Sequence, residues 1–259
     1  MWEHVSMGSM RKSNAGFSLI ELMIALFVSL FILAGLFYSV MGDMRSYESA
    51  RSTQGLVTKS RMAVQTIRLY IQQAGFRDSA ALKNETTFSA GTSSAGEAWE
   101  YGQVIQGMTS SSEIDDEKAD SDILVVRFLG AAVEGIVSCE GYDLDDTTSN
   151  EVILYVNTSN QLMCQDNDDD PVLLDENIEF MELLYGTEDD YQYFTASEVS
   201  DWTEINRVKV GLLISEDVSA HGLINSNDYT IFNQTISAAN DTNYRSVVME
   251  TVIIGNQGG

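Results

Sequence analysis

Phe17 to Met41 read FSLIELMIALFVSLFILAGLFYSVM, an unbroken apolar run in which Glu21 is the sole charge. As a helix of about 1.5 Å per residue, the run measures about 37 Å, enough to cross a hydrocarbon layer of roughly 30 Å with some tilt. Arg11 and Lys12 precede it, a positive flank that favours a cytoplasmic N-terminus. The stretch therefore predicts a membrane-spanning helix, with the remainder of the chain outside the cytoplasm.

A cleavable secretory signal is the other common reading of such a run, and it fits poorly. Signals of that kind are cut after the apolar stretch, at a small-residue site. Ala34 and Gly35 lie inside this run, and no polar cleavage region follows closely. A carboxylate within an apolar helix costs about 2.5–3.5 kcal/mol at mid-membrane and less near the end of the span, so Glu21 is expected to have a partner.

The charge of the chain divides it into a stem and a head. The 259 residues include 14 Lys and Arg against 39 Asp and Glu, a net charge of −25. Residues 17–83 carry a net charge of +3, whereas residues 84–259 carry −29. So large a negative charge repels nucleic-acid backbones and anionic lipid headgroups, which leaves apolar insertion as the means of membrane attachment.

Residues 16–26, GFSLIELMIAL, resemble the class III signal of type IV pilins and type II secretion pseudopilins. The resemblance implies that a prepilin peptidase cuts between Gly16 and Phe17 on the cytoplasmic side and methylates the new N-terminus. It also implies that Glu21 pairs with the freed amine of a neighbouring subunit's Phe17. A buried pair of this kind satisfies two charges and sets register. The leader begins at Met1, Met7 or Met10, and the alternative to assembly is a plain anchor in which Glu21 reaches the headgroups.

The helix is predicted to continue beyond the membrane. Ala50, Val57, Val64 and Ile71 recur every seven residues, and Tyr47, Ile67 and Ala74 fill the same face. Gly75 is a stop signal of the kind that follows helix C-termini. With only about four repeats and no ladder of flanking charges, the stripe favours packing against the chain's own head over a coiled coil.

Three further segments narrow the resemblance to PilW-type minor pilins: residues 61–76, 201–213 and 244–256. Short β-type runs separated by turn residues indicate an antiparallel sheet in the head. The predicted strands are Ile123–Leu129, Val133–Cys139, Val152–Val156, Gln161–Cys164, Val208–Ile214, Tyr229–Ile236 and Val247–Ile254. The predicted fold class is α+β and pilin-like. The predicted divisions are 1–16 (leader), 17–41 (membrane or filament-core helix), 42–76 (amphipathic continuation) and 77–259 (acidic, β-rich head).

The head contains both cysteines, Cys139 and Cys164, 25 positions apart. In an oxidising compartment they are expected to form a disulfide that joins a strand to a hairpin, which stabilises a loop of that length by about 3 kcal/mol. Two buried thiols are the alternative.

Acidic runs invite a calcium-site interpretation, which the residues support only weakly. Asp166, Asp168 and Asp170 alternate, but Pro171 stands where an EF-hand needs glycine and Asn177 where it needs glutamate. Irregular calcium loops are conceivable at Asp143, Asp145 and Asp146 or at Glu188, Asp189 and Asp190, yet acidic runs in so anionic a chain are usually solvated surface. We therefore expect no cofactor, with Ca²⁺ as the minority alternative.

The sequence offers no catalytic constellation. Its two histidines, His4 and His221, lie in the leader and in a Ser/Gly/Asn loop, so a zinc site or a histidine-based triad is improbable. We expect a non-enzymatic minor pilin of the bacterial inner membrane, with its head in the periplasm and later on the cell surface. Its expected partners are prepilin peptidase, other pilins, the assembly platform and membrane lipid, with no nucleic acid. The alternatives are a minor pseudopilin of a type II secretion system and a membrane-anchored adhesin that does not polymerise.

Overall fold

A single 55-residue helix, α1 (Leu19–Gln73), begins the structure, a computed structural model. The structure describes residues 16–77, 84–130, 135–141, 148–167, 169–188, 190–216 and 224–256. Outside these ranges lie the leader up to residue 15 with His4, as well as His221, Asp143, Asp145, Asp146, Asp168 and Asp189. The chain forms two compact units, which divide after Glu48.

In the second unit, the last part of α1 is a core element. Its buried residues are Leu56, Ser60, Ala63, Val64, Ile67, Tyr70, Ile71 and Gln73. The predicted stripe is therefore confirmed at Val64, Ile67, Ile71 and Ala74. It is wrong at Tyr47, Ala50 and Val57, which are exposed, Val57 by 50%. A straight α-helix drifts by about 20° per seven residues, so a strict seven-residue repeat turns away from the buried face, and Leu56 takes the place of Val57.

The helix ends just before Gly75, as predicted. Gly75 has φ +71°, a left-handed conformation that glycine adopts without steric cost. The Asn256 side-chain amide then donates to two carbonyls at the helix end, those of Gln72 (2.9 Å) and Ala74 (3.3 Å). The last described residue of the chain therefore caps the C-terminus of α1.

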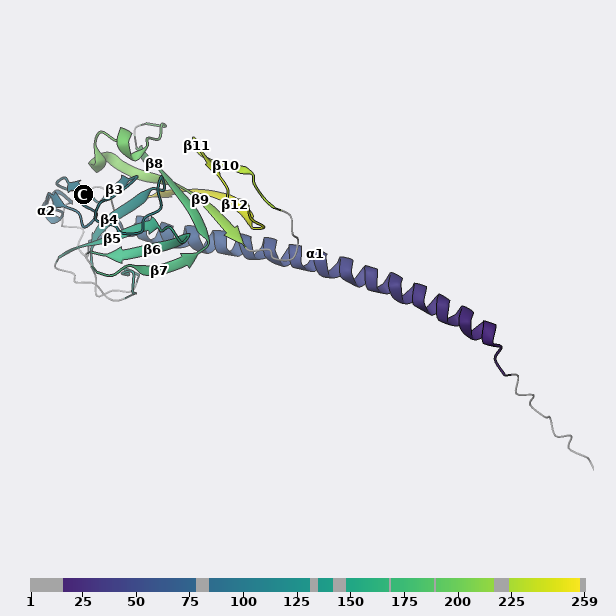
Figure 1. Cartoon of the computed structure of the whole chain (residues 1–259). Helices are drawn as coiled ribbons and strands as arrows, with labels where there is room; N and C mark the ends of the chain where they lie inside the picture. Colours follow the sequence, from purple (N-terminus) through teal and green to yellow (C-terminus); the bar gives the residue numbers. More distant parts are fainter. Residues whose placement is uncertain are drawn as a thin grey trace, which may run out of the picture. The chain divides into compact units, whose positions relative to one another are not determined.

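Two antiparallel sheets make up most of the head (Figure 1). The five-stranded sheet has the order β3 (Ile105–Met108), β4 (Ile123–Leu129), β5 (Ser149–Val156), β6 (Gln161–Asp166), β7 (Val172–Glu176). The three-stranded sheet has the order β12 (Tyr244–Ile253), β9 (Ile205–Glu216), β8 (Ile178–Thr187). The smaller elements are β1 (Gly91–Thr92) with β2 (Ala98–Trp99), the hairpin β10 (Asp228–Ile231) with β11 (Gln234–Ser237), α2 (Asn84–Thr87), η1 (Ala196–Glu198) and η2 (Trp202–Glu204).

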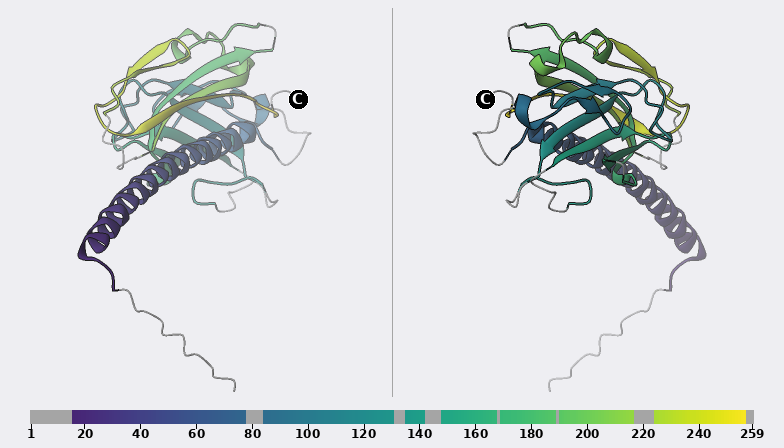
Figure 2. Two further views of the ribbon diagram at one scale, coloured as in Figure 1. Left: turned by 90° about the vertical axis from the view of Figure 1, so that its right-hand side faces the viewer. Right: turned by 90° about the vertical axis from the view of Figure 1, so that its left-hand side faces the viewer.

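The main hydrophobic core joins α1 to both sheets. It contains residues of α1, of strands β3 to β6 and of the three-stranded sheet, and Figure 2 shows the end of α1 lying along the strands. A second cluster, with Trp99 and Ile153, covers the other face of the five-stranded sheet. A third, with Phe180, Leu213 and Ile231, lies where the β10–β11 hairpin covers the three-stranded sheet. Packing of the helix against its own head, the preferred interpretation of the stripe, is confirmed.

Most predicted strands are present, and two predictions are wrong. Residues 135–139 form a turn and irregular backbone in place of the predicted strand Val133–Cys139, whose first two residues lie outside the described ranges. The run Tyr229–Ile236 is a hairpin, because Phe232 has φ +49° and reverses the chain. The strands β3, β7 and β8 were not predicted. Both faces of β8 are covered, so its sequence lacks the alternation that marks a half-buried strand.

Gly107 allows the two sheets to approach each other. A Cβ at this position would lie 1.8 Å from the hydroxyl oxygen of Tyr185, whose ring is fully buried. The ring also meets Trp202 edge-on, with 4.8 Å between the ring centres. Because the tyrosine cannot move into solvent, glycine is required where β3 faces β8.

Candidate assembly site

The start of α1 is closed by a capping box. The Ser18 backbone N–H donates to the Glu21 carboxylate (3.1 Å), and the Ile20 N–H donates to the Ser18 hydroxyl (3.3 Å). Together they satisfy two of the N–H groups that a helix leaves unpaired at its beginning. Sequence reasoning did not identify Ser18 as the cap, although the spacing Ser-x-x-Glu is the signature of this motif.

Gly16 and Phe17 lie just before the helix, in irregular backbone. The Phe17 side chain is 88% exposed, and the Gly16–Phe17 peptide bond precedes the capping box directly. The structure therefore brings the three predicted residues, Gly16, Phe17 and Glu21, into one short exposed segment. Glu21 is fixed at the first turn of the helix, where a negative charge is favoured by the helix dipole.

Every residue from Gly16 to Glu48 is exposed. In the described part of the chain α1 is the one helix long and apolar enough to cross a membrane, with a mean hydropathy of 2.6 over its best 18 residues. The Ser29 hydroxyl donates to the Ala25 carbonyl (2.7 Å), so this polar side chain is satisfied without water. The segment suits surroundings of lipid or of other apolar helices.

At the other end of α1, the irregular segment 137–139 of the head is held against the helix by hydrogen bonds. The Tyr70 hydroxyl donates to the Ser138 carbonyl (3.2 Å). The Gln73 amide binds Val137 twice, donating to its carbonyl (3.1 Å) and accepting from its N–H (2.9 Å). These bonds take the place of a strand ladder, which is why the predicted strand is absent here.

The same segment carries the predicted disulfide, which the structure contains. Cys139 is bonded to Cys164 of β6, with 5.5 Å between the Cα atoms. The Cys139 N–H also donates to the Asp166 carboxylate (2.8 Å). The prediction of the bond is confirmed, while its partner element is a turn and not a strand. Asp166, which belonged to the calcium interpretation, is buried and stabilises this turn through its bond to the Cys139 N–H.

Replacing both cysteines with serine is expected to lower the free energy of unfolding by about 3 kcal/mol, because the 25-residue loop gains freedom in the unfolded chain. Thermal or urea unfolding of the variant, compared with the oxidised parent, measures the loss. Treating the parent with a reducing agent serves as the control and should give the same decrease. An unchanged midpoint in both experiments would contradict the prediction.

A buried cation organises the segment between α2 and β3. Arg127 of β4, 3% exposed, donates to the backbone carbonyls of Ser89 (2.8 Å), Glu100 (2.8 Å) and Gln103. Its guanidinium lies 4.4 Å from the ring centre of Trp99. Burial lowers the pKa of Arg127 to about 10 and the nearby carboxylate of Glu151 opposes that shift.

Glu151 lies opposite Arg127 across the β4–β5 pair and completes this network. Its carboxylate accepts from the Trp99 indole N–H (2.7 Å) and from the Ser94 backbone N–H (2.9 Å). Burial raises the pKa of Glu151, and these bonds and the charge of Arg127 oppose the rise. The Arg127–Glu151 network therefore stabilises a segment rich in Ser, Gly and acidic residues that otherwise has few apolar anchors.

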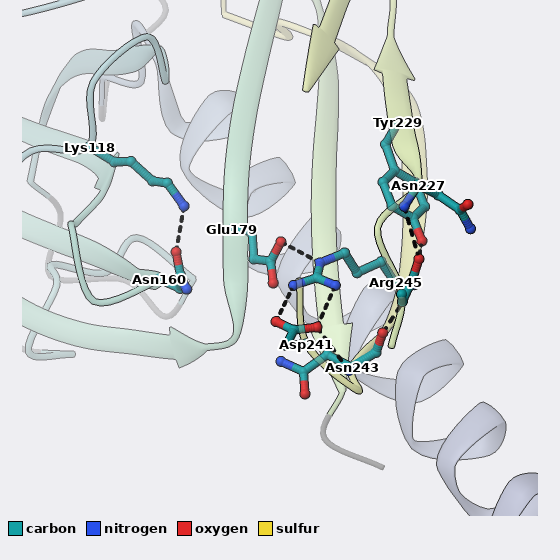
Figure 3. Close-up of polar contacts among 9 residues, drawn as sticks. Lys118, Asn160, Glu179, Asn227, Tyr229, Asp241, Asn243 and Arg245 are labelled. Atoms are coloured by element: carbon teal, nitrogen blue, oxygen red, sulfur yellow. Dashed lines mark hydrogen bonds and ion pairs between the residues drawn. The ribbon is translucent and has the colours of Figure 1, made fainter. Parts of the chain in front are cut away.

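A second arginine, Arg245, holds the base of the β10–β11 hairpin, which lies between β9 and β12 in the chain (Figure 3). Arg245 lies between Glu179 of β8, at 2.7 Å, and Asp241, which it binds through two nitrogens at 2.6 and 2.8 Å. Nearby, the Asn225 amide donates to the Tyr229 hydroxyl (3.0 Å). The arrangement joins β12, β8 and the base of the β10–β11 hairpin, a structural role for acidic side chains.

Two buried carboxyl groups line the free edge of β8. The Asp122 carboxylate accepts the Leu183 N–H (2.7 Å), and the Ser121 hydroxyl accepts the Met181 N–H (3.0 Å), so the edge strand is covered. Burial raises the pKa of Asp122 to about 7, and the charge of Glu182 adds to the rise. Burial likewise raises the pKa of Glu182 to about 7.

These raised pKa values predict a pH dependence of stability. In the unfolded chain both groups ionise near pH 4, while in the folded chain they hold their protons up to about pH 7. The contribution of these two groups to stability is therefore fullest below pH 4 and falls as the pH rises towards 7, by on the order of 3 kcal/mol for each group. Asp122→Asn keeps an oxygen that can accept the Leu183 N–H, so it should flatten this dependence in urea unfolding. The exposed control Asp170→Asn should leave it unchanged, and equal slopes for Asp122→Asn and the parent would refute the prediction.

For metals, the described ranges contain no group of three or more His, Cys, Asp or Glu side chains that could hold an ion. Asp166 is committed to the Cys139 turn, and Asp170 and Glu188 are exposed. Asp190 is exposed, and its carboxylate accepts the Gln192 N–H (2.9 Å). The remaining acids of the calcium interpretation lie outside the described residues, as do both histidines.

Two family models match parts of this chain. Residues 142–256 match the family described as Type IV Pilus-assembly protein W, and residues 11–37 match the prokaryotic N-terminal methylation motif. No protein of the curated set matches the chain. A solved type IV-like pilin from Thermus thermophilus is 14% identical, with a TM-score of 0.45 over 78% of this chain and 98% of that one.

An exposed apolar helix with a capped acid at its start, joined to a disulfide-bonded antiparallel head, defines a type IV pilin-like protein. The two family matches, over residues 142–256 and 11–37, support a type IV minor pilin with a class III signal. The predicted fold class, α+β with a long N-terminal helix, is confirmed.

Proposed function

We propose that this chain is a prepilin that is cut between Gly16 and Phe17, methylated on Phe17 and assembled into a type IV pilus as a minor subunit. Its role there is to prime assembly or to cap the filament. The observation that carries the proposal is the segment 16–48, which is wholly exposed, apolar as far as Met41 and capped by Ser18 and Glu21. The match to the methylation motif, residues 11–37, covers its first part.

Before assembly, the proposed location is the bacterial inner membrane. Residues 17–41 span the bilayer, with the leader 1–16 in the cytoplasm and the head, residues 77–259, in the periplasm. The positive flank of Arg11 and Lys12 supports this orientation. Residues 42–76 continue the helix into the head, and the disulfide favours an oxidising compartment.

Assembly exchanges lipid for neighbouring helices with little change in apolar exposure, so hydrophobicity alone gives no specificity. The Glu21 carboxylate supplies it by pairing with the Phe17 ammonium of a neighbouring subunit. The Ser18 N–H donates to one oxygen of the Glu21 carboxylate, Oε2, at 3.1 Å. A carboxylate has acceptor sites beyond that one bond, so capping and pairing are compatible.

The proposed partners are prepilin peptidase, other major and minor pilins, the inner-membrane assembly platform and, before assembly, lipid. Filaments sheared from cells that express the full chain test this proposal. The chain should be recovered in the sheared fraction, and pilus numbers should fall when it is absent. Recovery only in membranes, with normal pili in its absence, would leave the anchored adhesin as the function. A defect confined to protein secretion would assign the chain to a type II system.

A further inference from the structure

We infer that the outward face of the head-side part of α1 docks on the acidic head of a neighbouring pilin subunit. This basic face carries Arg51 and Arg61, with the exposed side chains of Val57, Met62 and Leu69 among them. The inference rests on the proposed function, because it needs the chain to be placed beside other pilins.

The charge of this helix segment is one-sided. Residues 49–77 contain five basic residues and no acidic one. Two of the cations form ion pairs with carboxylates of the chain's own head, Lys59 with Glu216 of β9 and Arg68 with Glu250 of β12. Cation–carboxylate pairing is therefore the way in which this helix already contacts a pilin head along its flanks.

Arg51 and Arg61 have no such partner among the residues that the structure describes, and both are exposed. The apolar side chains beside them remain open to solvent, with 50% of Val57, 60% of Met62 and 41% of Leu69 exposed. Val57 lies four residues before Arg61, and Met62 lies seven residues before Leu69 and eleven after Arg51, which places them on adjoining parts of one helix surface. The face thus combines two unpaired cations with apolar contact area, a composition suited to a protein partner.

Charge complementarity identifies the occupant. Residues 84–259 of this chain carry 34 acidic residues against five basic ones, so a head of this kind presents carboxylates over much of its surface. Two basic faces would repel each other, which disfavours helix-to-helix pairing here. A carboxylate-bearing head is the partner whose charge matches the face.

A lipid surface fits less well. Arg61 lies twenty residues beyond Met41 in the helix, and at about 1.5 Å per residue that is about 30 Å of helix. Electrostatic attraction to headgroups fades within a Debye length of about 8 Å at physiological salt. Arg61 is therefore beyond the reach of a membrane that ends near Met41.

Zero-length carbodiimide cross-linking of filaments and membranes from cells expressing full-length Arg61→Lys tests the inference. The variant keeps the positive charge and supplies an amine that couples only to a carboxylate in direct contact. We expect a cross-link from position 61 to an Asp or Glu of another pilin chain. Native Lys59 is an internal control, since it should couple to Glu216 of its own chain.

The outcomes are distinguishable. If the chain is in filaments and Lys59 couples to Glu216, but position 61 gives no cross-link to another chain, the inference is wrong and the proposed function stands. If the chain never enters filaments, the inference and the proposed function both fail. A cross-link to a pilin head supports both the inference and the proposed function. Reversing the charge at position 61 alone should then impair assembly, and reversing the charge of the cross-linked acid as well should restore it.

A charge-reversal variant gives a second readout. Arg51→Glu/Arg61→Glu should lower incorporation into filaments by about tenfold or more at physiological salt. Arg51→Gln/Arg61→Gln should have a smaller effect. Because neither arginine forms an ion pair with any residue that the structure describes, the unfolding midpoints should match that of the parent. An equal loss from the membrane fraction would point to headgroups and overturn the inference.

Discussion

Glu21→Ala is expected to reduce the amount of the protein in filaments by about a hundredfold, which corresponds to about 2.8 kcal/mol, while its amount in the membrane is unchanged or higher. The substitution leaves the neighbouring Phe17 ammonium without its counter-charge among apolar helices, and an unpaired charge in such surroundings is strongly disfavoured. Insertion itself becomes easier, because the helix loses its carboxylate. Quantitative immunoblots of sheared and membrane fractions measure the two amounts.

Glu21 also caps the helix, so the two roles need separate variants. Glu21→Gln can still accept the Ser18 N–H but carries no charge, and it should fail to assemble as Glu21→Ala does. Ser18→Ala removes the hydroxyl cap and keeps the charge, and it should assemble with at most a mild loss. Normal assembly of Glu21→Gln would show that the carboxylate acts through capping and would contradict the pairing.

Arg127→Met should destabilise the head by about 3–5 kcal/mol, the largest effect expected for a substitution in the folded core. The guanidinium satisfies three backbone carbonyls and lies against the Trp99 ring, and none of these contacts survives in the variant. Glu151 would keep its burial without a compensating cation. Urea unfolding of the full chain in detergent, followed by Trp fluorescence and circular dichroism, measures the change.

The double variant Arg127→Met/Glu151→Gln is the matched control, since it removes the charge that the first substitution leaves unpaired. Its destabilisation should be smaller than the sum of the two single effects, because the residues are cross-strand neighbours on β4 and β5 and their charges interact. Additive effects would mean that Arg127 acts through its carbonyl contacts and ring stacking alone. A loss below about 1 kcal/mol for Arg127→Met would refute its structural role.

The stem could be predicted from the sequence because its signals are local. The apolar run, the lone Glu21 and the stop at Gly75 are each set by a few neighbouring residues, and α1 begins and ends where they indicate. The disulfide was also predictable, since Cys139 and Cys164 are the chain's only cysteines. Ser18 was overlooked although its capping signature is equally local.

The head was less predictable because its decisive contacts join residues far apart in the chain. β8 has both faces covered, by the main core and by the β10–β11 hairpin, so its sequence shows no alternation. The clamp on residues 137–139 depends on Gln73, sixty-four positions away from Val137. An arginine in a strand usually faces solvent, and nothing near Arg127 in the sequence reveals the carbonyls that converge on it.

The mass of the mature N-terminus tests the central claim most directly. Intact-mass and N-terminal peptide analysis of the protein from cells with an active prepilin peptidase should give a chain that begins at a methylated Phe17. Recovery of a chain that retains Gly16 and the residues before it, in the same cells and with other pilins correctly processed, would contradict the account.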